Sequence, residues 1–433
     1  MPLIDSANED GVHGNGRPSA VTRRRLGLII GIIVLALAIV IAIAIASMLV
    51  ITSVDRARPN IHRTVASSEG LTSALAEAKA VGGGSIRLAK GNYRLEHDME
   101  IPANVTVDGQ GSTIVVTSNG SDAVSLGDAS GLKNLRIRAS GRVAALVVVP
   151  GSASGVTISG CTLTGITGQS GIVAGAPVNR LTISDTSLNN VKNGITLKGA
   201  KDTTVEQVRV KDWTTHGVWV LGTGSNPATN VRLTGLNVGA NVGVGQSRYP
   251  IAVMTSDGRN KDITVENSTV SGRGTAHNDR RRPGTADQIS VTRTDGVLIQ
   301  HDTSISGGDR GINVTSSSGV IVRHNVVARA DASGIGIGST GAGKGNSDVT
   351  VEDNRVSNCG LSRLGAAAML PMERTGIRLV QVTHGIVSAN RIAVTSRGGR
   401  ETYGVTTYRD VGVSVTGNAM SGPMAQRVLR NAG

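Results

Sequence analysis

Phenylalanine is absent from this 433-residue sequence, and the other aromatic residues are scarce, with two Trp and four Tyr. Proteins that bind single-stranded nucleic acid without sequence preference stack successive bases on aromatic side chains. Because so few such side chains are available, we expect no nucleic-acid partner. The core must instead be built from Val, Ile and Leu, and the 58 glycines suit a fold with many tight turns.

Acidic residues are in the minority. The chain has 31 Asp and Glu against 44 Lys and Arg, a formal net charge of +13. A basic surface favours anionic partners such as uronate polymers, phosphate polymers or lipid headgroups, although charge alone is equally compatible with an inert basic surface. The partner that we expect is an anionic polysaccharide.

A short unit repeats along most of the chain. Its first half is a Gly followed by alternating apolar and polar residues, the period-two pattern of a half-buried strand, as in Gly311-Ile312-Asn313-Val314. Its second half has apolar residues at the first, third and eighth positions, as at Val320, Val322 and Val327. The spacing of the units lies within the roughly 20–50 residues that indicate stacked supersecondary units.

No single unit can bury its own apolar face, so each must stack on its neighbours. The units have short strands rich in β-branched residues and no helix. Strands of this kind that pair with the next unit, rather than with their sequence neighbours, form a parallel β-helix. The sequence therefore predicts an all-β solenoid.

The start of the repeat region has the most specific pattern. Ser68 to Lys79 is typical of a short amphipathic helix, and Gly91-Asn92-Tyr93 and a segment from Ile101-Pro102 to Gly109-Gln110-Gly111 follow it. This order of helix, strand, G-x-Y and I-P-x-x-V-x-V-x-G-x-G resembles the entry segment of the pectate-lyase-like right-handed parallel β-helix superfamily. The resemblance covers roughly residues 67–420 and implies a right-handed coil whose first edge is covered by the helix.

The N-terminal region differs from the repeats. Residues 1–22 are polar and aperiodic, which predicts a disordered cytoplasmic tail. Residues 23–51 begin with three Arg and continue as an uncharged apolar run, Leu26 to Ile51, long enough to span a bilayer as a helix. The positive-inside rule keeps the tail in the cytoplasm and exports the rest. We expect a single-pass cell-membrane protein of bacterial type, with a linker over 52–66 and the β-helix over 67–433.

A cleaved signal peptide is the alternative interpretation of the apolar run, because Ala44-Ile45-Ala46 is typical of a cleavage site. The run exceeds the usual apolar region of a signal peptide, about 7–15 residues, which favours a retained anchor. Both interpretations place the repeats outside the cytoplasm.

Two residue types are expected to serve the fold. Cys161 and Cys359 lie about seven coils apart, which at roughly 4.8 Å per coil is too far for a disulfide, so they are predicted to be buried core residues. Four Asn residues at the sixth position of their repeats are predicted to adopt unusual dihedral angles at corners and to hydrogen-bond along the stack: Asn325, Asn354, Asn390 and Asn418.

Function is expected on the outward side of the Gly-Ile-x-Val strands, where the x residue points away from the core. Long insertions beside these strands should wall a cleft. Residues at x, or just before each strand, form a mixture typical of a sugar subsite: His216, Trp219, Tyr249, Asp287, Asp309, Arg310, Asn313 and Arg378. The alternative is that the acids are turn residues and that Arg310 is their ion-pair partner.

Three functions are compatible with these residues. A uronate lyase or C5-epimerase removes the proton α to the carboxylate, with Arg310 or Arg378 neutralising the charge and His216 or Tyr249 acting as base or acid. Trp219 and Asn313 would then bind the sugar. The resemblance also suggests Ca²⁺ as a candidate cofactor, although the sequence has no clustered carboxylate cage.

A glycoside hydrolase would instead need two carboxylates across the scissile bond, for which Asp287 and Asp309 are the best pair and Asp279 is a second option. The third function is a non-catalytic adhesin or envelope scaffold. The motifs of polygalacturonases, pectate lyases and alginate epimerases are absent, so the resemblance implies a fold and no catalytic residue. The leading hypothesis is a membrane-anchored, extracytoplasmic β-helix that binds and modifies an anionic polysaccharide by lyase or C5-epimerase chemistry.

Overall fold

The computed structural model describes residues 60–430, except 121, 167, 240–241, 243–247, 273–285, 340–344, 361–370, 396–401 and 425. The predicted tail, the anchor over 23–51 and Asp279 lie outside these residues. Within the described part of the chain, no helix is long and apolar enough to cross a membrane.

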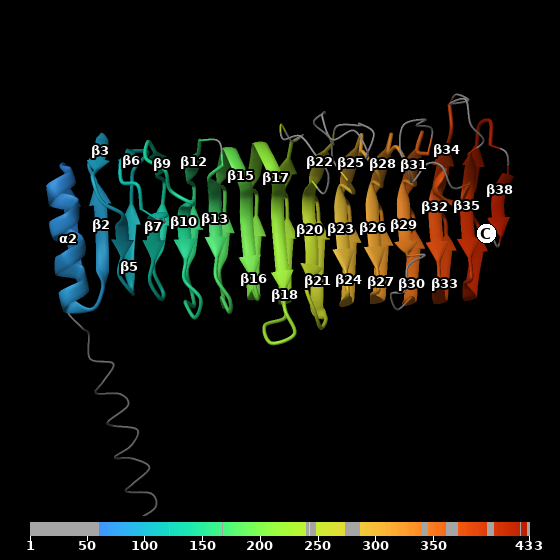
Figure 1. The fold of residues 1–433 in the computed structure, drawn as a ribbon, viewed down its shortest axis with the longest axis horizontal. Coiled ribbons are helices and arrows are strands. Elements are labelled where there is room, and N and C mark those ends of the chain that lie inside the picture. The colour runs from blue at the N-terminus through green and yellow to red at the C-terminus, as the bar shows by residue number, and fades with distance from the viewer. Residues whose placement is uncertain are drawn as a thin grey trace, which may run out of the picture. The chain divides into compact units, whose positions relative to one another are not determined.

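The strands stack in three columns, and every pairing between successive coils is parallel (Figure 1). The first column is a 14-stranded sheet made of β1 (Ile61–Val65), β2 (Gly84–Leu88), β5 (Val105–Asp108), β8 (Gly131–Lys133), β11 (Thr157–Ser159), β14 (Thr182–Ser184), β16 (Lys201–Glu206), β18 (Thr229–Thr234), β21 (Asn260–Glu266), β24 (Thr294–Gln300), β27 (Ser318–Arg323), β30 (Asn346–Glu352), β33 (Val382–Ser388) and β36 (Val411–Thr416).

The second column consists of β3 (Asn92–Leu95), β6 (Thr113–Val116), β9 (Arg136–Ala139), β12 (Thr162–Thr164), β15 (Ser187–Lys198), β17 (Arg209–Gly222), β19 (Asn237–Val238), β22 (Thr269–Ser271), β25 (Thr303–Ile305), β28 (Val326–Ala328), β31 (Arg355–Ser357), β34 (Arg391–Ala393) and β37 (Ala419–Ser421). The third consists of β4 (Met99–Ile101), β7 (Asp122–Leu126), β10 (Ala145–Val149), β13 (Ser170–Ala174), β20 (Tyr249–Thr255), β23 (Ile289–Thr292), β26 (Ile312–Thr315), β29 (Ile335–Gly338), β32 (Thr375–Val380), β35 (Tyr403–Tyr408) and β38 (Gln426–Arg430). The long strands β15 and β17 run through both columns and join them into one 24-stranded sheet.

The predicted alternation is confirmed in the core. In β27, Val320 and Val322 are fully buried, and the register places them on Val297 and Ile299 of the preceding coil. Identical positions of successive coils therefore stack, so that aliphatic side chains form continuous files inside the solenoid. Cys161 and Cys359 are buried free thiols, as expected for core residues.

The first coil is covered by the helix α2 (Ser68–Val81), which confirms the predicted cap (Figure 1). Ser67 caps its first turn by accepting a hydrogen bond from the Gly70 N–H at 3.0 Å, and Gly82 ends it with a φ of 90°. The solenoid begins earlier than predicted, because β1 pairs with β2 although Ile61–Val65 lies in the segment interpreted as a linker. That segment has too few apolar residues to show the repeat pattern.

Asparagine side chains form a ladder along one corner, as predicted. Each side-chain oxygen accepts a hydrogen bond from the backbone N–H of the equivalent residue in the preceding coil, at 2.9–3.0 Å, through Asn325, Asn354, Asn390 and Asn418. The predicted dihedral angles are wrong by one position. The residue before each Asn takes the positive φ, as His324 does at 56°, because the Asn side chain itself turns inward to reach the backbone.

Asp302 continues this ladder by one coil. Its Oδ1 accepts from the Ser268 N–H at 2.7 Å, as an Asn oxygen would. In the other rungs the Nδ2 group donates to a carbonyl of the preceding coil, but the buried Oδ2 of Asp302 has no hydrogen-bond partner in the described structure. Burial, and secondarily the charge of Glu266, raises the pKa of Asp302 to about 7.

We expect Asp302→Asn to stabilise the protein at neutral pH, because the amide can donate where a carboxylate cannot. The Asp302 carboxyl has a higher pKa in the folded state than in the unfolded state, where it is near 4. The free energy of unfolding therefore falls as the pH rises from about 4 towards 7. The free energy of unfolding of the parent should fall by up to about 4 kcal/mol across this pH range, whereas that of the variant should not show this decrease. Denaturant unfolding of parent and variant at pH 5 and pH 8 measures the two changes. A variant less stable than the parent at pH 8 would contradict this account.

Candidate functional site

The outward residues of the third column lie in one file, as predicted. The strand register pairs every member with the next: Val173, Thr196, Trp219, Ala252, Ser290, Asn313, Gly336, Arg378 and Thr406. Among the described residues, the file does not form the predicted open cleft along its whole length. From Ala252 onward the outward side chains are buried, while Trp219 is partly exposed.

An aromatic cluster occupies the first part of the file. The His216 ring stacks on Trp219 with a centroid distance of 4.5 Å, and on Tyr249 of the next coil with a distance of 5.9 Å. The parallel register between β17 and β20 brings His216 beside Tyr249. Asn193, on the preceding coil, contacts His216 Nδ1 through its side-chain oxygen at 3.2 Å. These residues come from three successive coils.

Arg248 lies beside this cluster and influences its charge. One guanidinium nitrogen donates a hydrogen bond to the Thr214 carbonyl, which anchors the side chain near His216. Burial, followed by the charge of Arg248, lowers the pKa of His216 to about 4. His216 is therefore neutral at physiological pH, so one of its ring nitrogens carries no proton. Burial also lowers the pKa of Arg248.

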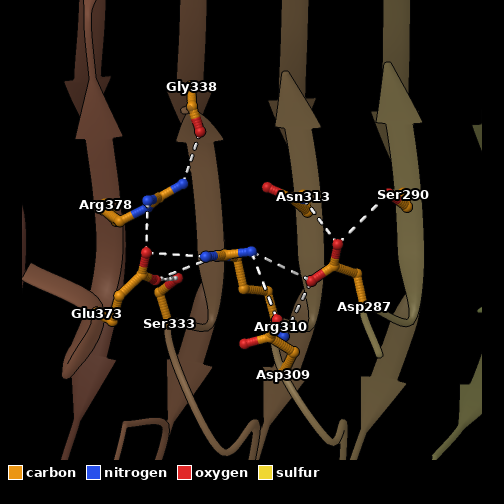
Figure 2. A network of polar contacts seen from close by, with 9 residues as sticks. All are labelled: Asp287, Ser290, Asp309, Arg310, Asn313, Ser333, Gly338, Glu373 and Arg378. Carbon is orange, nitrogen blue, oxygen red and sulfur yellow. Dashed lines mark hydrogen bonds and ion pairs between the residues drawn. The ribbon is translucent and has the colours of Figure 1, made fainter. Parts of the chain in front are cut away.

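A charged network occupies the second part of the file (Figure 2). Asp287 accepts hydrogen bonds from Asn313 Nδ2 at 2.7 Å and from Ser290 Oγ at 3.4 Å. Its other oxygen lies 3.5 Å from Arg310 Nη1, and Asp309 lies 3.7 Å from the same nitrogen. The guanidinium of Arg310 thus occupies the place between two carboxylates where a cation would be held.

Glu373 completes the network and was missed by the sequence analysis. It ends the 3₁₀ helix η2 (Pro371–Glu373), just before β32. Its carboxylate accepts two hydrogen bonds from Arg310, at 2.8 and 3.1 Å, and one from Arg378 at 2.6 Å (Figure 2). The Ser333 hydroxyl, at 3.4 Å, is a further polar partner. The available signal was the presence of two arginines, Arg378 in the file and Arg310 just before β26, which together need a further acid.

Mutual charge keeps the network ionised despite burial. Burial opposes the charge of Arg310, but Glu373, Asp309 and Asp287 outweigh it and raise its pKa. Burial likewise opposes the charge of Glu373, and the two arginines lower its pKa. Burial and the like charge of Arg310 lower the pKa of Arg378 to about 10. Removal of Glu373 takes away the carboxylate that Arg378 contacts, and removal of Arg310 leaves three buried acids against Arg378 alone, so either change is strongly destabilising.

The predicted residues therefore separate into two groups rather than one site. His216, Trp219 and Tyr249 form the aromatic cluster, whereas the predicted acids, arginines and Asn313 belong to the network. In the register, Ala252 and Ser290 separate Trp219 from Asn313. Over the described residues, no group of three His, Cys, Asp or Glu side chains could hold a metal ion.

Gly336 is the position on which the network geometry depends. The Arg310 side chain crosses it to reach Glu373, and a Cβ there would lie 2.6 Å from Arg310 Cδ and 3.3 Å from Ser333 Oγ. Gly336→Ala should therefore displace Arg310 and destabilise the protein by about 3 kcal/mol, the order expected when a buried ion pair is broken. Denaturant unfolding measures the change.

The matched control is Gly91→Ala, where an added Cβ meets nothing nearer than 3.8 Å. This variant should stay within about 0.5 kcal/mol of the parent, as surface substitutions usually do. Equal destabilisation by the two substitutions would show that Arg310 is not confined by the space over Gly336.

Comparisons with known proteins agree with this architecture. A family model described as the right-handed beta helix region matches residues 193–362. No curated protein matches the sequence. The A-module of the Azotobacter vinelandii mannuronan C-5 epimerase AlgE6 is 15% identical with a TM-score of 0.52, and the alignment covers 84% of this chain and 94% of the epimerase module.

The surface adhesin PfbA of Streptococcus pneumoniae is 13% identical with a TM-score of 0.53, and the alignment covers 84% of this chain and 87% of the adhesin. Likenesses at such identities establish a shared fold and no shared activity. Together with the parallel three-column stack and its helical cap, they show that the chain has the right-handed parallel β-helix fold, with residues 193–362 matching the right-handed beta helix family.

Proposed function

We propose that this protein binds an anionic polysaccharide on the outward face of the third column, with the aromatic cluster as the sugar site. The observation that carries the proposal is the partly exposed Trp219 ring, which stacks on neutral His216; His216 in turn stacks on Tyr249 and lies near the cation Arg248. An aromatic ring offers an apolar platform for a sugar, and a guanidinium recognises a carboxylate through paired hydrogen bonds. The net charge of +13 favours the same class of ligand.

The charged network is a weaker candidate for the primary sugar site. Its arginines already have carboxylate partners, and Arg378 and Glu373 are only 2% and 3% exposed. The same contacts argue against hydrolysis by Asp287 and Asp309, because both carboxylates serve as counter-ions of Arg310. A hydrolase needs one carboxyl as a proton donor and the other as a nucleophile or base.

Trp219→Ala should weaken binding of a polyuronate at least tenfold, about 1.4 kcal/mol, because it removes the platform of the site. Isothermal titration calorimetry of the full-length chain with an oligouronate measures this change. The matched control is Tyr408→Ala, which removes an aromatic ring that contacts Arg409 instead of the cluster. If both variants bind as tightly as the parent, the sugar site lies elsewhere.

A second candidate function is modification of the bound uronate by a lyase or C5-epimerase. It is favoured by one observation: His216 is a neutral base stacked on Tyr249 and next to Arg248. Arg248 would neutralise the uronate carboxylate and His216 would take the proton at C5. In a lyase, the C4–O4 bond then breaks as the C4=C5 double bond forms, and the Tyr249 hydroxyl would protonate the departing O4; in an epimerase, Tyr249 would return a proton to C5 from the opposite face. This assignment replaces Arg310 by Arg248 as the neutralising residue. The structural relative from A. vinelandii is itself a mannuronan C-5 epimerase.

His216→Asn should abolish any lyase or epimerase activity, because asparagine can hydrogen-bond but cannot act as the base. Lyase activity is measured by the ultraviolet absorbance of the unsaturated uronate product, and epimerisation by NMR of the polymer. The activity of the parent should decline as the pH falls towards 4, where His216 gains a proton. A variant with parental activity would remove His216 from the mechanism, and a chain inactive on all acidic polysaccharides would leave binding alone.

We also propose that residues 26–51 anchor the protein in the cell membrane, with the solenoid outside the cytoplasm. The support is the uncharged apolar run that follows three arginines. The chain should remain in the membrane fraction after alkaline carbonate extraction, and protease added to intact cells should digest the solenoid. Release of a chain that begins after Ala46 would instead identify the run as a cleaved signal peptide.

A further inference from the structure

We propose that Arg310, Arg378 and Ser333 form a carboxylate-binding site on the outward face, and that the protein's own Glu373 occupies it as an internal ligand. The ligand class is a small carboxylate, such as acetate or a hexuronate. The natural ligand of this site would be a uronate of the bound polymer, and this identification rests on the proposed function. The existence of the site does not depend on it.

The contacts of Glu373 are those of a bound anion. Two guanidinium groups from alternate coils converge on one carboxylate with three N–H donors between 2.6 and 3.1 Å, and the Ser333 hydroxyl adds a fourth contact at 3.4 Å (Figure 2). Paired guanidinium hydrogen bonds of this kind are the usual means by which proteins recognise carboxylates. Glu373 therefore shows the position that an added carboxylate would take.

The anchoring of the two arginines makes the site largely independent of Glu373. Arg310 is also bound by Asp287 and Asp309, at 3.5 and 3.7 Å. Arg378 donates a further hydrogen bond to the Gly338 carbonyl at 2.6 Å. Both guanidinium groups should therefore stay in place when the Glu373 carboxylate is removed, and they would then lack their nearest counter-ion.

Unused polar atoms beside the site also indicate a ligand larger than a carboxylate. Arg378 Nε and Asn313 Oδ1 are buried, and neither has a hydrogen-bond partner in the described structure. In the register these two residues lie on either side of Gly336, which has no side chain. The donor and the acceptor, one on each side of the Arg310 side chain that crosses Gly336, could pair with hydroxyl groups of a uronate whose carboxylate replaces that of Glu373.

The test is chemical rescue in the full-length chain. Glu373→Ala should lower the melting temperature, because it leaves two buried guanidinium groups without their nearest counter-ion. Sodium acetate should then raise the melting temperature of this variant more than sodium chloride at the same concentration, and should have no such effect on the parent. Glucuronate should bind the variant at least tenfold more tightly than the parent, and glucose should bind neither.

Two control variants separate a built site from a general salt effect. Glu373→Gln keeps the volume of the side chain, so it should not respond to acetate. Glu266→Ala removes another buried acid, but its partner Arg232 has a side chain that is 58% exposed, so acetate should act there no differently from chloride. The proposal is overturned if acetate and chloride act alike on Glu373→Ala, if Glu266→Ala responds equally, or if Glu373→Ala stays unfolded in acetate.

This test is independent of the polysaccharide. Rescue by acetate together with unchanged polymer binding by Trp219→Ala would retain the carboxylate site and reject the proposed sugar site. Tighter polymer binding by Glu373→Ala than by the parent would show that the carboxylate site and the aromatic cluster bind the same polysaccharide molecule.

Discussion

Each strand of the solenoid pairs in parallel with the strand at the same position of the next coil, and the placement of nearly every functional group follows from this pairing. A residue at position x of one coil must lie beside position x of the next, at the roughly 4.8 Å spacing of paired strands. The register pairs from Thr196 to Thr406 show that this holds along the outward file. Residues separated by tens of positions in the sequence can thus act as neighbours.

The same constraint explains why two chemically different groups share one face. Aromatic rings on adjacent coils can stack with little strain, as His216 does with Trp219 and Tyr249. Charges on adjacent coils must alternate in sign or be bridged, because like charges at this spacing repel. Glu373 bridges Arg310 and Arg378, which lie on alternate coils. One region therefore offers a partly exposed ring to a ligand, and the other satisfies its charges internally.

The sequence predicted the outward file residue by residue, because the alternation of apolar and polar residues determines which side chains leave the core. It also predicted the capping helix and the Asn ladder. It did not predict Glu373, since that residue lies outside the repeat and reaches the file through a 3₁₀ turn. Nor did it predict how Arg310 reaches Glu373, because the long Arg310 side chain has to cross Gly336. Periodicity specifies backbone register, whereas such contacts depend on side-chain conformation.

The central claim is that the aromatic cluster is the sugar site of this β-helix. The most direct test is a crystal structure of the protein with an oligouronate. The account predicts a sugar ring against Trp219, with its carboxylate at Arg248 and its C5 atom facing His216. An oligosaccharide bound on the outward face of the first column, or one that leaves Trp219 and Arg248 untouched, would contradict it.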